Sequence, residues 1–504
     1  MSGIADLEAP SVKITSQYAL NCAHEDTTKN LPSVFRLGPF EQLAVPYLPV
    51  TVIFVYDIAQ SGGEDLVSVS RLHQALDRLL DYYPHLTGRR CIDPLDGTTH
   101  IGRLGTGAAL YTAECSSRLD AFRKDSPDGE ARFAMSDLPG SGELLAAATG
   151  STVEGTSQEP ILTVQHTRFA CGSVSLGVRL HHIVCDLNGF FQMMRDLSEI
   201  YRGIGAAEAA GGTYQDVTLK EVPCIQSHIP QGSEQELAAS EELESYTEET
   251  SSLSSAKPVA TNVASPPPVV GRILRFSGKE LKALKEAATD KATGGWVSTF
   301  EALSAHLWQS VHRARTQLNP ERADGDGETL DTCSDLLAPV NCRSRLNLPA
   351  RYFSNAIVCP HARLPFRTLQ HATLAEIAQT LHDMLQGVTA SKVEGTLRRI
   401  SAQGGTVKQR FRLGPDSFVV TPWNKVDMYG VYFDTDSEGR RISPVLVSAP
   451  FTPISLVDGL AFYLPTGVLS GHGLDPDPSI DVSLTLLETI WEVLDKDPNF
   501  RKFR

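Results

Sequence analysis

The segment HHIVCDLNG, residues 181–189, contains the residues whose types and spacing are best suited to chemistry. It ends a predicted strand and begins a predicted helix, so His182 lies at a strand end, where side chains converge on a cleft. An imidazole with a pKa near ~6.5 can accept a proton at neutral pH. His182 is therefore a candidate general base, although a buried core histidine explains the same local features equally well.

The HxxxD spacing is a weak signal by itself, because a chain with 14 histidines contains about one such pair by chance. His73 and Asp77 form a second pair, but they lie within a predicted helix, where this spacing usually gives a surface contact. We interpret His73 as structural. Cys185 lies inside the motif, and we interpret it as a small packing residue rather than a nucleophile.

The elements that must position His182 follow from hydrophobic periodicity. In the first half, it predicts a helix at 66–83, strands at 161–169 and 174–181 with a turn at 170–172, and a helix at 189–201. In the second half, it predicts strands at 271–276, 336–341, 417–421, 429–433 and 460–464, a capped helix beginning at Ser298, and a helix near 483–494. Helices and strands alternate in both halves, which indicates two α/β domains.

A change in composition separates the two halves. Residues 221–256 contain no Lys, Arg or Asp, and Glu221 with seven further glutamates carries eight negative charges of a net −15. Such a stretch is typical of a solvated linker. We therefore expect an N-terminal domain at 1–205, a linker or crossover loop at 206–269 and a C-terminal domain at 270–504.

Net charge and missing signatures exclude several classes of function. The acidic balance argues against nucleic acid and against docking on an anionic membrane, because both partners require a cationic face. The sequence contains no GxSxG elbow, no P-loop and no CxxC pair for zinc. No secretory signal and no apolar run of ~18 residues is visible, and the nine scattered cysteines suggest reduced thiols. We expect a cytoplasmic protein without a bound metal.

Several further motifs occur in one order along the chain: LGPFEQ at 37–42, YYPHLTGR at 82–89, STFEALSAHLW at 298–308, and NCRSRLN at 341–347 followed by YFSN at 352–355. Together with the strand pair that leads into HHIVCD, they resemble motifs of the BAHD acyl-CoA-dependent acyltransferases. The resemblance is closest to the fungal branch, which includes trichothecene 3-O-acetyltransferase-like proteins, and it extends over nearly the whole chain.

This resemblance implies a fold of two chloramphenicol-acetyltransferase-like α/β domains with mixed sheets, joined by the acidic crossover linker. His182 would deprotonate an acceptor hydroxyl, which would attack the thioester of acyl-CoA without a covalent acyl-enzyme. Acetyl-CoA is the default co-substrate of the fungal branch, and no permanently bound cofactor is implied. We expect a monomer whose partners are acyl-CoA and a small-molecule alcohol from secondary metabolism.

The resemblance also assigns roles around the motif. Asp186 would turn away from the reacting atoms and form a structural ion pair with Arg343, or with Arg345 in a shifted register. Thr421 aligns with a threonine that lies near the tetrahedral centre and would donate to the oxyanion, although a plain strand residue is the simpler reading. Gly189 would supply a turn, because Leu187 and Asn188 displace the usual glycine after the aspartate.

Further residues would bind the two substrates. Ser298 and Thr299 open a helix whose N–H groups could meet the co-substrate, although Ser298 also reads as a plain N-cap. Asn355 and Trp423 are candidates for contact with the acceptor, and Trp308 is more typical of a core residue. The C-terminal DFGWG motif of the family is eroded to YFDTD at 432–436.

Two alternatives remain beside the acyl-CoA-dependent enzyme. A condensation-domain-like protein shares the fold and the HHxxxDG motif, but it would take acyl groups from a carrier protein. The STFEAL and NxRxR segments argue against it. A catalytically dead binding homologue is compatible with the eroded DFGWG, whereas the retention of His181 and His182 argues against it.

Overall fold

The computed structural model describes residues 11–45, 48–63, 65–125, 131–147, 157–230, 241–248, 267–290, 295–320, 333–403, 407–411, 413–466, 479–500 and 502–503. The chain forms two compact units. The first comprises Met1–Ser227, Pro349–Asn355 and Val426–Thr452, and the second comprises His228–Leu348, Ala356–Lys425 and Pro453–Arg504. Two late segments thus belong to the first unit, whereas the domains expected from the sequence, 1–205 and 270–504, are each continuous.

The first unit is built on a six-stranded mixed sheet with the order β1-β6-β9-β10-β3-β19. Its strands are β1 (Val12–Leu20), β3 (Pro49–Tyr56), β6 (Ala108–Cys115), β9 (Leu162–Phe169), β10 (Val174–His181) and β19 (Leu446–Ser448). β10 pairs antiparallel with β3 and β9, and β6 pairs parallel with β9. The predicted strand pair is confirmed, and Gly172 adopts a φ of 95° in its turn.

Smaller elements complete this unit. A three-stranded sheet has the order β2-β5-β4, and a two-stranded sheet pairs β7 with β8. These elements are β2 (Val34–Arg36), β4 (Arg89–Ile92), β5 (Thr99–Gly102), β7 (Arg123–Asp125), β8 (Ala131–Phe133), α1 (Glu25–Lys29) and α2 (Pro39–Gln42). The short helix α2 lies within the LGPFEQ segment.

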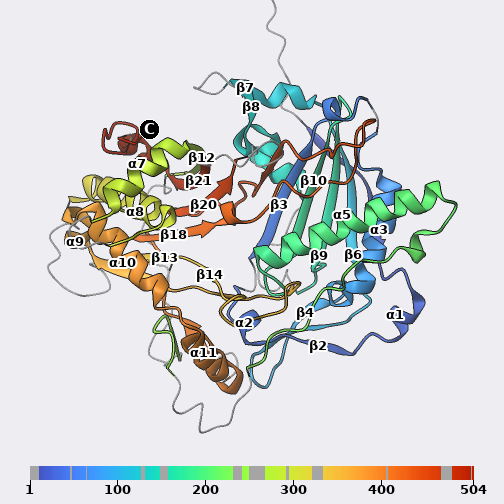
Figure 1. Ribbon diagram of the computed structural model, residues 1–504, viewed down its shortest axis with the longest axis horizontal. Coiled ribbons are helices and arrows are strands. Elements are labelled where there is room, and N and C mark those ends of the chain that lie inside the picture. Colours follow the sequence, from blue (N-terminus) through green and yellow to red (C-terminus); the bar gives the residue numbers. More distant parts are fainter. Residues whose placement is uncertain are drawn as a thin grey trace, which may run out of the picture. The chain divides into compact units, whose positions relative to one another are not determined.

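Two long helices, α3 (Val69–Tyr82) and α5 (Leu187–Ala209), lie along one face of the six-stranded sheet (Figure 1). They confirm the helices predicted at 66–83 and 189–201. Phe191 of α5 contacts Phe54 of β3 with ring centroids 5.8 Å apart, and Leu176 of β10 pairs with Phe54. Since side chains two residues apart share a face of a strand, β10 presents alternate residues to α5 up to the motif.

The second unit has its own six-stranded sheet, with the order β12-β21-β20-β18-β13-β16. Its strands are β12 (Val269–Phe276), β13 (Cys333–Leu337), β16 (His361–Pro365), β18 (Ser417–Pro422), β20 (Leu460–Pro465) and β21 (Ile480–Leu487). Its helices are α7 (Gly278–Ala288), α8 (Thr299–Leu318), α9 (Phe366–His371), α10 (Leu374–Gln386), α11 (Ala390–Gln403) and α12 (Glu488–Leu494). Two short pairs, β11 (Tyr246–Glu248) with β17 (Val407–Gln409) and β14 (Val340–Asn341) with β15 (Ile357–Val358), complete it.

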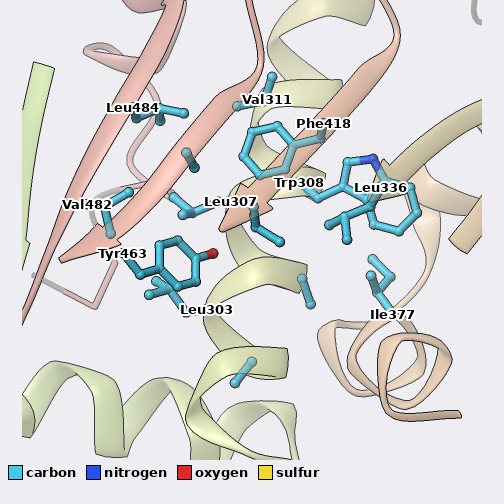
Figure 2. Packing of buried hydrophobic residues seen from close by; sticks show 14 of the residues in the cluster. Leu303, Leu307, Trp308, Val311, Leu336, Ile377, Phe418, Tyr463, Val482 and Leu484 are labelled. Carbon is cyan, nitrogen blue, oxygen red and sulfur yellow. The ribbon is translucent and has the colours of Figure 1, made fainter. Parts of the chain in front are cut away.

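Helix α8 runs through the core of this unit. Figure 2 shows Leu303, Leu307 and Trp308 of α8 among the side chains of the sheet, and all three are fully buried. The Trp308 indole Nε1 donates to Ser334 Oγ at 2.8 Å, which satisfies the buried polar group. The interpretation of Trp308 as a core residue is confirmed.

One predicted strand is wrong, and the last predicted helix begins later than expected. Residues 429–433 form no strand, and their apolar side chains are buried for another reason, because Phe433 packs edge-on against Tyr56 and Tyr201 of the first unit. Residues 483–487 end strand β21, so the last helix begins only at Glu488. The alternation of Val482, Leu484 and Leu486 with polar residues fits a strand, as all three are buried.

The predicted linker is partly folded. Residues 206–209 complete helix α5, and β11 pairs antiparallel with β17. Leu243 and Tyr246 are buried, and Glu242 forms an ion pair with Arg399 of α11 at 2.8 Å. The apolar residues between the glutamates therefore anchor this stretch on the second unit. Glu234, Glu236 and Glu249 lie outside the described residues.

Candidate active site

His182 is the first residue after strand β10. Its main-chain N–H donates to the Leu48 carbonyl at 3.2 Å. This hydrogen bond continues the pairing of β10 with β3 by one residue beyond the strand. Its side chain is partly exposed, while Nδ1 is buried and has no hydrogen-bond partner within the described residues. The strand end therefore holds the backbone of His182 firmly.

The protonation of His182 is set by its surroundings. Burial lowers the pKa of its imidazole below the ordinary value, and hydrogen bonding to the backbone, the charge of Asp186 and the Asn355 side chain oppose this. The net direction is downward, so the ring is neutral at pH 7. A neutral imidazole is the form that accepts a proton.

Asp186 is the N-cap residue of α5. Its Oδ1 accepts from the Gly189 N–H at 3.1 Å, and its side chain is almost fully buried. A carboxylate at a helix N-terminus satisfies an otherwise unpaired N–H group and interacts favourably with the helix dipole. In the first unit Asp186 therefore orients the start of the helix that follows His182. The structure also buries Cys185 completely, in agreement with a packing role.

Gly189 has a different role from the turn that the sequence suggested, because it lies within the first turn of α5. A Cβ at this position would lie 1.8 Å from the Phe353 carbonyl oxygen and 2.9 Å from Cys185 Cβ. Backbone O atoms cannot approach a Cβ so closely, so only glycine permits this contact. Gly189 is required for the close approach of segment 349–355 to the motif.

Segment 349–355 is anchored to the first unit by an ion pair and by aromatic packing. Arg351 forms an ion pair with the buried Asp196 of α5, which also accepts from Tyr83 Oη at 2.6 Å. The Phe353 ring packs edge-on against Tyr83 at 4.8 Å and His85 at 5.4 Å. The YFSN motif is thus held beside the HxxxD motif by contacts that are distant in sequence.

Asn355 links this segment directly to the candidate base. Its Nδ2 donates to the His182 carbonyl at 2.9 Å, and its own N–H donates to Glu41 Oε1 at 2.8 Å. Glu41 Oε2 in turn accepts from the Gly38 N–H at 2.9 Å. Sequence analysis missed Glu41, although a carboxylate inside the apolar LGPFEQ segment is an unusual residue for a buried helix.

Two buried histidines flank this arrangement. Burial lowers the pKa of His85 to about 3, and neither of its ring nitrogens has a partner in the described part of the chain. His181 is also buried, and burial together with Arg179, Arg90 and Arg89 lowers its pKa to about 3. Both rings are neutral and act as packing groups. By contrast, His73 and Asp77 lie within helix α3, as expected, and His73 Nε2 is 3.9 Å from Asp77 Oδ2.

The other predicted site residues belong to the second unit. Ser298 is the N-cap of α8, where its Oγ accepts from the Glu301 N–H at 3.3 Å and the Glu301 side chain accepts from the Ser298 N–H. The capping box is therefore confirmed. Beside this helix start, Trp296 is 60% exposed, and Lys285 Nζ lies 4.9 Å from the centroid of its indole. Sequence analysis did not single out either residue.

Thr421 and Trp423 lie at the end of β18 and directly after it. Thr421 is half-buried. Trp423 is buried, with its indole 4.9 Å from the Phe462 ring. The Arg345 guanidinium donates to the carbonyls of Val388 at 2.8 Å and Asn341 at 3.2 Å within the same unit.

The described residues do not group three or more His, Cys, Asp or Glu side chains as a metal site requires. None of the described helices is long and apolar enough to span a membrane. In the first unit, strand pairing and Asn355 hold the backbone of His182, and burial lowers the pKa of its imidazole. Such a group suits proton abstraction from an acceptor.

Comparisons with known proteins give a consistent result. A family model described as Transferase family matches residues 11–449. Anthranilate N-benzoyltransferase protein 3 of Dianthus caryophyllus is 25% identical over 359 residues, 69% of this chain and 71% of the relative. Shikimate O-hydroxycinnamoyltransferase of Nicotiana tabacum is 24% identical over 397 residues, 78% of this chain and 82% of the relative.

Solved structures share the fold. F. graminearum TRI101, complexed with coenzyme A and deoxynivalenol, aligns with a TM-score of 0.65 and 18% identity over 93% of this chain and 98% of that chain. Vinorine synthase aligns with a TM-score of 0.64 and 15% identity over 96% of each chain. Like these structures, the chain has a two-domain mixed α/β fold.

Proposed function

The chain belongs to the Transferase family of BAHD acyl-CoA-dependent acyltransferases, and we propose that it transfers an acyl group, acetyl by default, to a hydroxyl of a small secondary metabolite. The observation that carries this proposal is the state of His182. Its Nδ1 is buried without a partner among the described residues, its backbone is held by Leu48 and Asn355, and burial lowers the pKa of its ring. A group held in this way is prepared to accept a proton with little reorganisation.

The proposed reaction has one transfer and no covalent acyl-enzyme. His182 removes the proton of the acceptor hydroxyl, and the oxygen attacks the thioester carbonyl to form a C–O bond. The tetrahedral intermediate collapses as the C–S bond breaks, and the thiolate takes the proton from His182. A thiol with a pKa near ~8.5 is a good leaving group, so the enzyme requires no nucleophile of its own.

Asp186 is proposed to act by position rather than by chemistry. It caps α5 and raises the pKa of the neighbouring imidazole through its charge. We retain the structural ion pair with Arg343 as part of the proposal. Both arginines also have contacts inside the second unit, since Arg343 Nη1 donates to Asn341 Oδ1 at 3.4 Å and Arg345 donates to the carbonyls of Val388 and Asn341, so Arg345 stays the alternative partner.

Thr421 is the proposed donor to the oxyanion, because it is a half-buried residue near the end of β18 with a hydroxyl that can donate a hydrogen bond. Trp423 remains a candidate for acceptor contact. Asn355 is only 1% exposed, and its Nδ2 donates a hydrogen bond to the His182 carbonyl. Its contacts therefore favour a positioning role over the acceptor contact expected from the sequence.

The N-terminus of α8 is the proposed contact for acyl-CoA. Ser298 and Thr299 are at this end, and the N-terminal end of a helix favours an anion through the helix dipole. The cation of Lys285 and the exposed indole of Trp296 lie beside it, and they suit the phosphates and the aromatic base of a nucleotide thioester. The positions of Lys285 and Trp296 support the proposal that Ser298 both caps α8 and contacts acyl-CoA.

The acceptor class rests on resemblance to the fungal branch. The two sequence relatives named above, from Dianthus caryophyllus and Nicotiana tabacum, come from plants, and one of them is an N-acyltransferase. A panel of alcohols and aromatic amines, offered with acetyl-CoA, tests the proposal by the release of free thiol. We expect release with an alcohol in the wild type and loss of release in His182→Ala. The matched control is His73→Ala, which removes the histidine of the second HxxxD pair. Release only with an acylated carrier protein, or no His182-dependent release with any donor, would refute the proposal.

A further inference from the structure

Glu41 is a buried carboxylate whose two oxygens serve two different parts of the first unit. Its side chain is in the short helix α2 and is 1% exposed. Oε2 accepts from the Gly38 N–H at 2.9 Å, at the start of its own helix. Oε1 accepts from the N–H of Asn355, 314 positions later in the chain, at 2.8 Å. The first contact is local, whereas the second has no role in forming α2.

The contact with Asn355 continues to the candidate base. The same residue that gives its main-chain N–H to Glu41 gives its side-chain Nδ2 to the His182 carbonyl at 2.9 Å. Two hydrogen bonds therefore connect the Glu41 carboxylate to the backbone of His182. We propose that Glu41 is a positioning residue for His182, acting through Asn355. This inference rests on the proposed function of His182 as the base.

The two main-chain contacts of Glu41 need a side chain with two oxygens that can each accept a hydrogen bond. Oε2 accepts from the Gly38 N–H, and Oε1 accepts from the Asn355 N–H. Burial raises the pKa of Glu41 to about 7, and the amides of Asn355 and Gly38 together with the Ser227 hydroxyl oppose this rise. An amide in place of the carboxylate would turn an NH₂ group toward one of the two N–H donors. Glu41→Gln is therefore nearly isosteric but cannot reproduce both contacts.

Loss of the Glu41 contact does not release segment 349–355 from the first unit. The ion pair of Arg351 with Asp196 and the packing of Phe353 against Tyr83 hold the preceding residues independently. The contact of Glu41 is with the last residue, Asn355, whose main-chain N–H it accepts. We therefore expect a change in the placement of His182 while the segment remains docked.

The test is a double-mutant cycle on thiol release, with Glu41→Gln, Asn355→Ala and the double variant. Small misplacement of a catalytic group lowers kcat by up to about 100-fold, so we expect each single variant to lose about 10- to 100-fold in kcat. The KM for acyl-CoA should change by less than about twofold. Since Glu41 acts through Asn355, the double variant should be no slower than Asn355→Ala alone.

Gln42→Ala is the matched control, because Gln42 is the next residue of α2 and also forms two hydrogen bonds, both to the Thr99 backbone at 2.8 Å. It should lower the melting temperature without lowering kcat. If Glu41→Gln does not fold, Glu41→Asp replaces it in the cycle. A wild-type kcat in the Glu41 variant, or effects that multiply in the double variant, would overturn the inference. Failure of this inference can be distinguished from failure of the proposed function. If the proposed function is wrong, thiol release by the wild type will not depend on His182.

Discussion

The close approach of Gly189 to segment 349–355 gives a sharp prediction for Gly189→Ala. The added methyl carbon would lie 1.8 Å from the Phe353 carbonyl oxygen. Real Cβ–O contacts are not shorter than about 3 Å, so the carbonyl or the helix must move by roughly 1 Å. Because Phe353 is two residues from Asn355, this displacement reaches the hydrogen bond to the His182 carbonyl.

The expected change in the free energy of unfolding of Gly189→Ala follows from two opposing effects. Alanine is favoured over glycine in a helix by up to about 1 kcal/mol. Overpacking against a backbone group costs about 1–3 kcal/mol and sometimes more. We expect a net loss of about 1–2 kcal/mol in the free energy of unfolding. A displacement of about 1 Å near the base should also lower kcat/KM by about 100-fold.

The control for this prediction is Gly205→Ala, the same substitution in the same helix. A Cβ at 205 would lie 3.2 Å from the guanidinium end of Arg71, which is flexible and can give way. Urea denaturation and thiol-release kinetics of both variants separate the effects. Gly205→Ala should keep or gain stability and keep its activity. Equal stability and equal activity in the two variants would refute the argument that this contact positions the site.

Three further predictions concern single side chains. The pKa of His85 is about 3 in the folded protein and near ~6.5 when unfolded, so the unfolded state binds more protons and stability falls as the pH decreases from 6.5 toward 3. At pH 5 this amounts to about 2 kcal/mol, and the advantage of His85→Leu over wild type should grow by about that amount between pH 7.5 and 5 in urea denaturation; an advantage that stays the same at both pH values would contradict this. Asp186→Ala should lower both soluble yield and rate, because it removes the cap of α5; full yield with slower turnover alone would contradict the positional role. Thr421→Val should lower kcat by about 100-fold at unchanged melting temperature, and an unchanged kcat would exclude it as the oxyanion donor.

The sequence was sufficient to predict the immediate surroundings of His182. The strands of β9 and β10 and the helix α5 follow from local periodicity, and the HxxxD segment falls between them. The role of Gly189 could not be predicted, because the contact that requires glycine comes from Phe353, far away in the chain. A turn was the only local reason for a glycine at that position.

Glu41 and Asp196 were missed for a related reason. Each carboxylate is buried by contacts with segment 349–355, and sequence patterns do not show which distant donors will reach a buried acid. The same limit applies to the division into units. Strand β19 joins the first sheet by pairing with β3, which lies almost 400 residues earlier. Composition and periodicity cannot reveal such pairings.

The most direct measurement is the kcat for thiol release from acetyl-CoA, with the best acceptor, in the wild type, His182→Ala and His73→Ala. A positioned general base contributes about 10²- to 10⁴-fold to a rate. We predict a loss of that size in His182→Ala at unchanged melting temperature, and the wild-type rate in His73→Ala. Equal rates in all three proteins would contradict the assignment of His182 as the base.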